Sequence, residues 1–467
     1  MSWASAISLD RLRRDGRAVA RIGSKQIALF DTGAGIYACN NRCPHEGYPL
    51  REGKLDQACL LTCNWHNWKF DLRTGANLYG GDRLRIYPTR IVDDTVWVDV
   101  SDPSAAERTS TALTNLHGAF DDHEYDRMAR ELARLRKAGS DPAEAVAAAI
   151  GWSHERLEFG TTHAYAASAG WLQLHDRLDD DEARLICLLE AIGHMAWDTL
   201  REPAYPYRGE AAPWDASAFR AAIEAQDEDG AVARVRGALA EGRHFADLEQ
   251  AFTAAALSHY ADFGHSLIYV VHTRRLIARL GAAVELPLLL ALVRSLVYAT
   301  REEFIPEFRR YAAALEAWPR HRRKPTGDLP RTGALLDRSI NDTLATVVEQ
   351  AAHTPVEALY GALLGAGAFN LLRFDARFQA QTDGTIAQNV GWLDFTHAIT
   401  FANAVRLQCG KFPELWPPAL LQMACFVGRN TGFVDRTIDV DAWRVDDRTA
   451  FDAGCIAQIL DHGEDQY

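Results

Sequence analysis

The pattern of apolar and polar positions along the chain changes near residue 100. Before it, short segments of alternating apolar and polar residues, such as 26–30, 36–39 and 96–100, are separated by glycines. A period of two is typical of β-strands, and glycine between short strands favours tight turns. After Pro103 the apolar positions recur at helical spacing, and Ala, Leu, Arg and Glu become abundant. We therefore predict a small antiparallel β-barrel followed by a large all-α region.

This change in the spacing of apolar residues predicts a multidomain chain. We place the all-β domain at residues 1–102 and the all-helical domain at residues 116–467, joined by a linker at 103–115 that is rich in Ser and Thr. The chain has 467 residues, 48% of them hydrophobic, which is enough for two or three domains with cores of their own.

The helical domain contains a weak internal repeat. Segments 158–165, 262–266 and 394–398 align on a histidine, and each histidine is followed 23 to 25 residues later by a Leu-Leu pair that opens a second apolar stretch. We expect a threefold repeat of a helix pair. If the copies stack with pseudosymmetry, the three histidines point into one shared cavity.

Two short segments of the β domain carry residues that bind metals. They are Cys43-Pro44-His45 and Cys63-Asn64-Trp65-His66, and seventeen residues separate them. Thiolates suit iron-sulfur chemistry, and imidazoles in place of half of them raise the reduction potential. A Cys2His2 zinc site usually takes its Cys pair from one turn and its His pair from another, and ordinary buried Cys with loop His is the simplest alternative. Because each segment here supplies one of each, we predict a 2Fe-2S cluster and a role in electron transfer.

At these residues the first hundred positions resemble the Rieske ferredoxin family, whose pattern is Cys-x-His, a spacer of this size, and Cys-x-x-His. The resemblance implies that Cys43 and Cys63 hold the inner iron. It also implies that His45 and His66 hold the outer, more exposed iron, from which electrons leave.

The resemblance also bears on the reduction potential. High-potential members of the family carry an extra Cys in each loop and a hydroxyl donor to the cluster, whereas Tyr48, Trp65 and Trp68 stand at those places here. Fewer donors to the cluster sulfurs predict a potential at the lower end of the Rieske range of about −150 to +300 mV.

The repeated histidines suggest a second metal site. Asp262-x-x-His265 and Asp394-x-x-His397 each place a carboxylate and an imidazole on one helical face, as Glu-x-x-His motifs do in di-iron bundles. Together with Glu158 they predict either such a centre or a single non-haem iron held mainly by His163, His265 and His397. An acidic residue that only orients a core or capping histidine gives the same pattern. Further candidate ligands are Glu190, Glu302, His194, His259 and His272.

Beyond its first domain the chain matches ordinary Rieske oxygenases poorly. Their iron is held in a sheet-and-helix domain by two His five residues apart and a later Asp, whereas His259 and His265 are six apart in helical sequence. The helical half bears a faint resemblance to the questin oxidase-like enzymes, which are helical non-haem iron oxygenases. The resemblance assigns no position here, because that family's histidine and lysine pattern cannot be placed on these residues.

Charge and cysteine usage indicate which partners and which cellular compartment to expect. Residues 1–100 carry 14 Lys and Arg and 11 Asp and Glu, whereas the whole chain has a net charge of −13. The residues after position 100 are therefore strongly acidic. An acidic surface argues against a nucleic-acid partner. Six of the eight Cys lie outside the motif without disulfide-framework spacing, which favours a reducing compartment. The start has no apolar signal core, and the run Leu286–Leu292 is too short to span a bilayer. We expect a cytoplasmic protein without a membrane span.

These patterns predict an oxidoreductase in which the cluster passes single electrons to a non-haem iron oxygenase site that acts on a small apolar organic substrate. No phosphate-binding glycine loop is evident, so the electrons are expected from a separate reductase or ferredoxin. The alternative is a Rieske ferredoxin or redox sensor fused to a non-catalytic helical module for ligand binding or docking. The linker also permits a homo-oligomer in which domains cooperate across chains.

Overall fold

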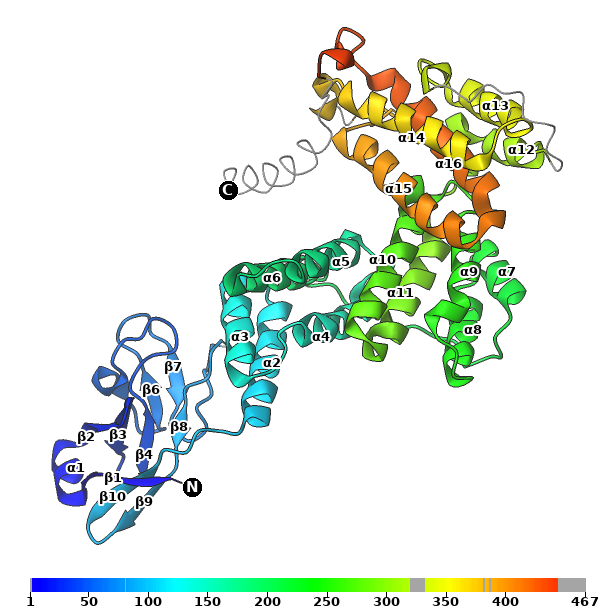
Figure 1. Cartoon of the computed structure of the whole chain (residues 1–467). Coiled ribbons are helices and arrows are strands. Elements are labelled where there is room, and N and C mark those ends of the chain that lie inside the picture. The colour runs from blue at the N-terminus through cyan, green and yellow to red at the C-terminus, as the bar shows by residue number, and fades with distance from the viewer. Residues whose placement is uncertain (1, 80, 320–331, 381–382, 386–387, 444–467) are drawn as a thin grey trace. The chain divides into compact units, whose positions relative to one another are not determined.

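The computed structural model describes all residues except 1, 80, 320–331, 381–382, 386–387 and 444–467 (Figure 1). The chain forms two compact units. The first contains Met1–Glu158, Thr162–Pro206 and Leu276–Leu288, and the second contains Phe159–Thr161, Tyr207–Arg275 and the chain from Leu289 onward.

The N-terminal domain is built of short antiparallel strands, as predicted. The strands form three sheets with the orders β1-β10-β9, β2-β3-β4-β8 and β5-β6-β7, and one helix, α1 (Leu9–Asp15), follows β1. The strand bounds are β1 Trp3–Ser8, β2 Arg17–Ile22, β3 Lys25–Asp31, β4 Ile36–Asn40, β5 Lys54–Leu55, β6 Leu60–Thr62, β7 Lys69–Asp71, β8 Ile86–Tyr87, β9 Thr89–Val92 and β10 Thr95–Asp99.

Strand β3 separates two apolar cores within this domain. Its side chains alternate between faces, so that Ile27 and Leu29 enter a core with α1 and β10. Phe30 enters a second core that also contains Cys43 and Cys63. Both cysteines of the predicted cluster site therefore pack in an apolar core.

Five further helices belong to the first unit, and the earliest of them replaces the predicted linker. Residues 103–115 are helical from Ala105 onward, because Ser104 and Glu107 form a capping box in which each side chain accepts the backbone N–H of the other, at 3.2 and 2.8 Å. The helices are α2 Ala105–Asp121, α3 Tyr125–Ala138, α4 Glu144–Ser153, α5 His163–His175 and α6 Asp181–Asp198.

A buried charge cluster ties the β domain to α3. Asp82 is fully buried in the loop before β8. Its carboxylate lies 3.0 Å from Arg134 Nη1, 3.3 Å from Arg130 Nε and 3.9 Å from Arg127 Nε. Burial raises the pKa of the neighbouring Glu131 to about 7. The first unit thus joins the β domain to helices.

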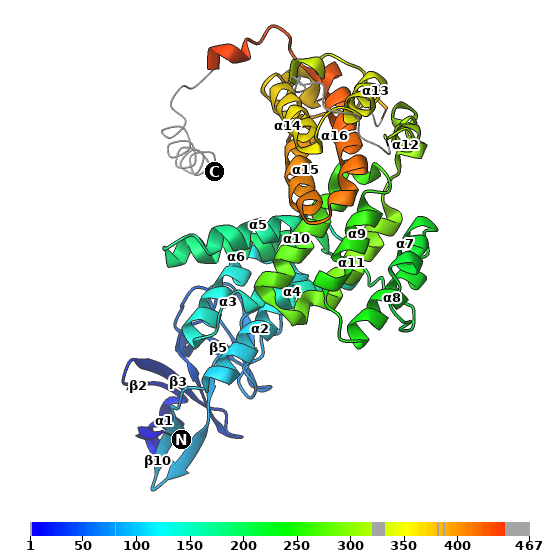
Figure 2. The same cartoon turned by 45° about the vertical axis from the view of Figure 1, so that its right-hand side comes forward.

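The second unit is helical. Within it α13, α14 and α15 pack against α16 (Figure 2). Its helices are α7 Ala216–Glu224, α8 Glu228–Ala240, α9 Phe245–Ala256, α12 Tyr311–Glu316, α13 Ile340–Ala351, α14 Val356–Leu372, α15 Trp392–Lys411 and α16 Trp416–Asn430. Helices α10 His265–Leu280 and α11 Glu285–Tyr298 also belong to it, except for their residues between Leu276 and Leu288, which belong to the first unit.

Consecutive helices follow the three histidines as α5 then α6, α10 then α11, and α15 then α16, and α5 packs on α6 and α15 on α16. Their histidines do not occupy equal places. His163 and His265 are the first residues of α5 and α10, whereas His397 lies in the second turn of α15.

One helical stretch, Ala282–Phe304, is long and apolar enough to cross a membrane by length and composition, although the run Leu286–Leu292 within it is too short by itself. In the structure 72% of its apolar window is buried. This burial is what a core helix requires, and length and composition alone are weak evidence for a membrane span.

Candidate metal centres

The two Cys/His loops of the β domain share one backbone design. In each, the Cys N–H donates to the carbonyl five residues later, and the Cys carbonyl accepts from the N–H four residues later, at 2.8 to 3.0 Å. The donor to Cys43 is Gly47, with φ 76°, and the donor to Cys63 is Asn67, with φ 60°. Gly and Asn are the residues that enter this left-handed region most readily. The sequence therefore folds two matching hairpin tips that face each other.

The four predicted ligands lie on these tips, with the two Cys next to each other and the two His next to each other. The Cys43 and Cys63 thiols are buried and form no disulfide. Burial, together with the neighbouring Cys63, raises the pKa of Cys43 to about 11, and a bound cation is what stabilises two adjacent thiolates in such a place. His45 Nδ1 lies 3.0 Å from His66 Nδ1. Two sulfurs and two Nδ1 atoms fit a cluster with one Cys-bound and one His-bound iron.

Aromatic residues surround the tips of the two loops. Trp68 stacks on His45 with ring centroids 4.5 Å apart, and Trp65 is 59% exposed. Tyr48 donates its hydroxyl to Glu52 Oε2 at 3.1 Å. Backbone N–H groups of His45 and Glu46 donate to the Cys43 sulfur, and the low reduction potential stays a prediction.

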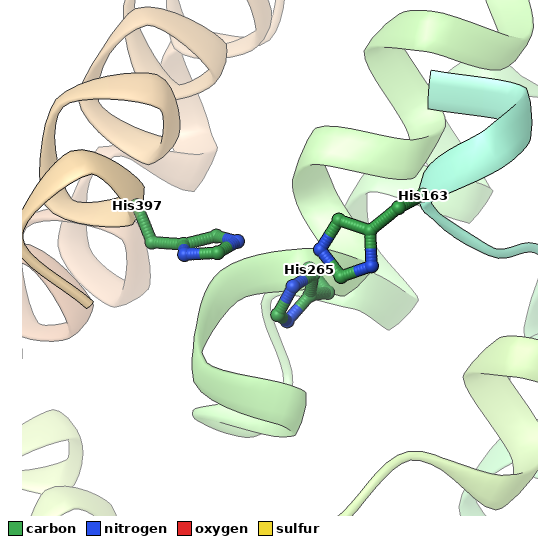
Figure 3. Close-up of side chains that lie close together, drawn as sticks. All are labelled: His163, His265 and His397. Carbon is green, nitrogen blue, oxygen red and sulfur yellow. The ribbon is translucent and has the colours of Figure 1, made fainter. Parts of the chain in front are cut away.

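Three histidines of the helical region also come together. The ligand atoms of His163, His265 and His397 all lie within 4.8 Å of one another, and Figure 3 shows the three rings meeting. The ring centroids of His265 and His397, both of the second unit, are 4.4 Å apart. Among the described residues, no Asp or Glu joins this group.

Backbone carbonyls set the tautomers of two of these rings. His265 Nδ1 lies 2.5 Å from Asp262 O, and His397 Nδ1 lies 2.5 Å from Leu393 O. A carbonyl only accepts, so each Nδ1 carries the proton and each Nε2 keeps its lone pair for a metal. Metal-binding histidines commonly donate their other N–H in this way, which orients the ring.

A strained turn places His265 at the start of α10. Asp262 and Phe263 have φ values of 50° and 51°, and Gly264 has φ 87°. Non-glycine residues in this region cost about 1 to 3 kcal/mol each, and such strain is concentrated at functional sites. Gly264 is required for a second reason, because a Cβ there would lie 2.7 Å from the Phe401 ring.

His163 is held through the residues just before it. The Thr161 N–H donates to Ala291 O of α11 at 3.1 Å. At Gly160 a Cβ would lie 2.2 Å from that same carbonyl. Thr162 caps α5 by accepting the Ala164 N–H and donates to Asp198 Oδ2 at 2.6 Å. Residues Phe159–Thr161 thus pack within the second unit, whereas Thr162 and Asp198 belong to the first unit.

Arg429 of α16 connects the helix starts that carry His265 and His397. It is 5% exposed and forms an ion pair with Asp394, the carboxylate that accepts the Gly391 N–H at the start of α15. Its guanidinium also lies 4.4 Å from the Phe263 ring centre. One buried cation thus contacts residues two and three positions before the two histidines.

Comparison with known proteins identifies the β domain. Residues 2–82 match the family model described as the Rieske [2Fe-2S] domain. The 3-phenylpropionate/cinnamic acid dioxygenase ferredoxin subunit of Shigella boydii serotype 4 (strain Sb227) is 33% identical over 88 residues, which cover 18% of this chain and 83% of that protein. Through this domain the chain belongs to the Rieske [2Fe-2S] family.

Two further relatives match in the Rieske domain. The 4beta-methylsterol monooxygenase of Methylococcus capsulatus (strain ATCC 33009 / NCIMB 11132 / Bath) is 33% identical over 101 residues, 19% of this chain and 27% of its own length. The solved ferredoxin of carbazole 1,9a-dioxygenase from Nocardioides aromaticivorans IC177 is 23% identical, with a TM-score of 0.20, and covers 21% of this chain and 97% of its own. The Rieske domain implies a 2Fe-2S cluster and fits electron transfer.

The carboxylates predicted for the helical site take other roles. The backbone carbonyl of Asp262 accepts a hydrogen bond from His265 Nδ1. Burial raises the pKa of the Asp262 carboxyl. Asp394 caps α15 and pairs with Arg429. Glu158 is exposed. The three imidazoles therefore form a carboxylate-free group, which fits a single ion better than a di-iron centre with bridging carboxylates.

The other candidate ligands also have different partners. Burial lowers the pKa of His272 to about 4, and His194 lies 3.9 Å from Asp198. Glu190 accepts the Tyr125 hydroxyl. His259 and Glu302 form an ion pair with each other at 3.1 Å.

Sequence reasoning missed Arg429 and the strained turn. Arg429 is the charged residue of α16, a helix otherwise made of apolar and uncharged polar residues. A lone charge in an apolar helix is a signal that could have found it. The left-handed backbone at Asp262 and Phe263 leaves no comparable mark in the sequence.

Proposed function

We propose that Cys43, Cys63, His45 and His66 hold the 2Fe-2S cluster, and that His163, His265 and His397 hold one non-haem iron in the helical region. With these groups bound, the cluster supplies single electrons and the iron supplies a site for dioxygen. The chain then acts as an oxygenase on a small, largely apolar organic substrate. The observation that carries the proposal is the convergence of three imidazoles, two of them with their tautomers set for metal binding.

The ligand set supports iron with open positions. Imidazole suits divalent iron as well as zinc, copper and nickel. Three protein ligands leave coordination positions for small molecules, which is typical of catalytic sites and not of structural ones. A Rieske domain in the same chain favours a redox-active metal over zinc.

Exposed apolar side chains near the ligands support an apolar substrate. Trp392 and Leu393, in the first turn of α15, are 47% and 65% exposed. Trp392 lies five residues and Leu393 four residues before His397, and Leu393 provides the carbonyl that orients it. Exposed apolar surface of this kind is typical of ligand-binding places.

The source of electrons follows from the Rieske domain. One relative is named as the ferredoxin subunit of a dioxygenase. We expect a separate reductase or ferredoxin as donor, with electrons passing through the half-buried His45 and the exposed His66.

Iron and sulfide analysis with EPR on the full-length, anaerobically purified protein tests the proposal. We expect about two irons and two labile sulfides for the cluster, and about one further iron after loading with Fe2+. The His397→Ala variant should lose only the further iron and keep the reduced Rieske EPR signal. His117→Ala is the matched control, because His117 is an exposed helical histidine near a carboxylate, 3.7 Å from Asp121.

A loaded protein with the cluster irons alone, or equal iron in His397→Ala and the parent, would contradict the proposed site. The ferredoxin or sensor with a non-catalytic helical module would then be favoured.

A further inference from the structure

His259 lies between two carboxylates in the second unit. Its Nδ1 is 3.1 Å from Glu302 Oε1, and its Nε2 is 3.0 Å from Glu224 Oε2. Carboxylates only accept, so both ring nitrogens donate and the ring is an imidazolium. The hydrogen bond to Glu302 raises the pKa of His259 most strongly, and Glu224 adds to this rise against the opposing effect of burial.

These partners come from separate elements and are fixed themselves. Glu302 is 3% exposed and accepts the Tyr260 N–H at 3.0 Å. Glu224 ends α7, and Arg301 donates to its carbonyl at 2.9 Å and to its carboxylate at 3.4 Å. His259 therefore links α7, the segment after α11 and its own loop.

The loop that carries His259 leads directly into the strained turn before His265. Gln422 of α16 donates to Leu257 O at 3.1 Å and to His259 O at 2.8 Å. The Asp262 N–H donates to Thr300 O at 2.8 Å. Residues 257–262 are thus held along their length, and strained backbone persists only where its surroundings over-determine it.

We propose that protonated His259 is a positioning residue, whose two salt bridges hold this loop in the strained turn and thereby place His265 for the metal. The inference rests on the proposed three-histidine site. A cavity of about 10 Å³, room for about one water, is lined by both His259 and Ser266, the residue after His265. The His259 side chain therefore lies close to the residue that follows His265.

The charges around His259 fix the sign of its pH dependence. The carboxylates of Glu224 and Glu302 hydrogen-bond to the His259 ring. Arg301 donates to the Glu224 carboxylate, and Arg220 lines the same cavity as His259. Because its pKa is raised in the folded state, its contribution is fully present below the unfolded value of about 6.5 and is lost as pH rises through the folded value. Metal affinity should first rise with pH as the ligand imidazoles lose protons and then fall as His259 becomes neutral.

Anaerobic equilibrium dialysis of the full chain with Fe2+ between about pH 6 and 9.5 tests this, counting iron beyond the cluster against labile sulfide. For His259→Gln we expect affinity about tenfold weaker at neutral pH, the lower end of what changes around metal ligands cause, with the alkaline fall absent. His259→Arg keeps a permanent cation with donors for both carboxylates and should bind near parental strength without the alkaline fall. Glu224→Gln alters the more exposed partner of His259 and should give a smaller loss of iron affinity. His117→Gln is the control and should bind iron as the parent does.

The outcomes separate the two proposals. If the parent binds no iron beyond the cluster, the three-histidine site itself fails. If the parent binds iron but His259→Gln matches its affinity and pH profile, or if His259→Arg shows the same alkaline fall, the positioning role is overturned. Should His259→Gln fail to fold, His259→Arg and Glu224→Gln still decide the question.

Discussion

At the scale of single residues, the sequence singled out the candidate ligands, which stay predictions, and missed the groups that orient them. The Cys and His spacing of the Rieske motif predicted Cys43, His45, Cys63 and His66, because each loop repeats one short pattern. The repeat also singled out the three helical histidines. It assigned Asp394 to the metal, whereas this carboxylate caps a helix and pairs with Arg429. An Asp three residues before a His has the same spacing in both roles, so sequence alone could not separate them.

Arg429 offers a test at this scale. Arg429→Met should leave Asp394 without its buried cation and loosen Phe263, so we expect a loss of about 3 to 5 kcal/mol of stability and less iron bound beyond the cluster. Arg429→Lys should recover part of both, because it keeps the charge without the planar fork. Chemical denaturation and iron analysis measure these effects.

Arg377→Met is the matched control. Arg377 also pairs with an Asp of the second unit, Asp375, but the Arg377 side chain is 83% exposed whereas that of Asp375 is 8% exposed, and solvent screens the exposed cation. Equal losses in the Arg377→Met and Arg429→Met variants would contradict the connecting role of Arg429.

At the scale of elements, helical periodicity predicted the helix pairs but not their starts. The Ser- and Thr-rich stretch after Pro103 looked like a linker, yet Ser104 and Glu107 cap a helix there, since polar residues favour both loops and caps. The turn before α10 was beyond prediction for another reason. Its left-handed residues are held by contacts far away in sequence, which no local pattern contains.

Gly264 tests this turn. Gly264→Ala adds a Cβ where φ is 87° and the Phe401 ring would be 2.7 Å away. We expect stability to fall by about 1 to 3 kcal/mol, together with a loss of iron from the second site. Thermal unfolding and iron content measure the two effects.

Gly281→Ala, with φ 84° and open space around the added Cβ, should show the backbone penalty alone and keep its iron. If Gly264→Ala retains full iron, the turn does not place His265.

At the scale of the whole molecule, composition and texture predicted the order of a β domain and a helical region. They did not predict how α3 is tied to the β domain through Asp82 and its three arginines. Those contacts join residues that lie about fifty positions apart in sequence. An Arg-rich helix more often has a solvated charged face, so the pattern alone favours the wrong interpretation. The cytoplasmic location and a homo-oligomer stay predictions.

The most direct test of the central claim is whether the Rieske cluster delivers its electron to the three-histidine site. The full chain, loaded with Fe2+ and reduced anaerobically, is mixed with dioxygen, and the loss of the reduced Rieske EPR signal is followed by rapid freezing. We predict fast re-oxidation in the parent and at least about tenfold slower re-oxidation in His265→Ala and His397→Ala, a tenfold rate being about 1.4 kcal/mol of barrier. Equal rates in the parent and both variants, with the cluster intact, would contradict an oxygenase function for the helical region.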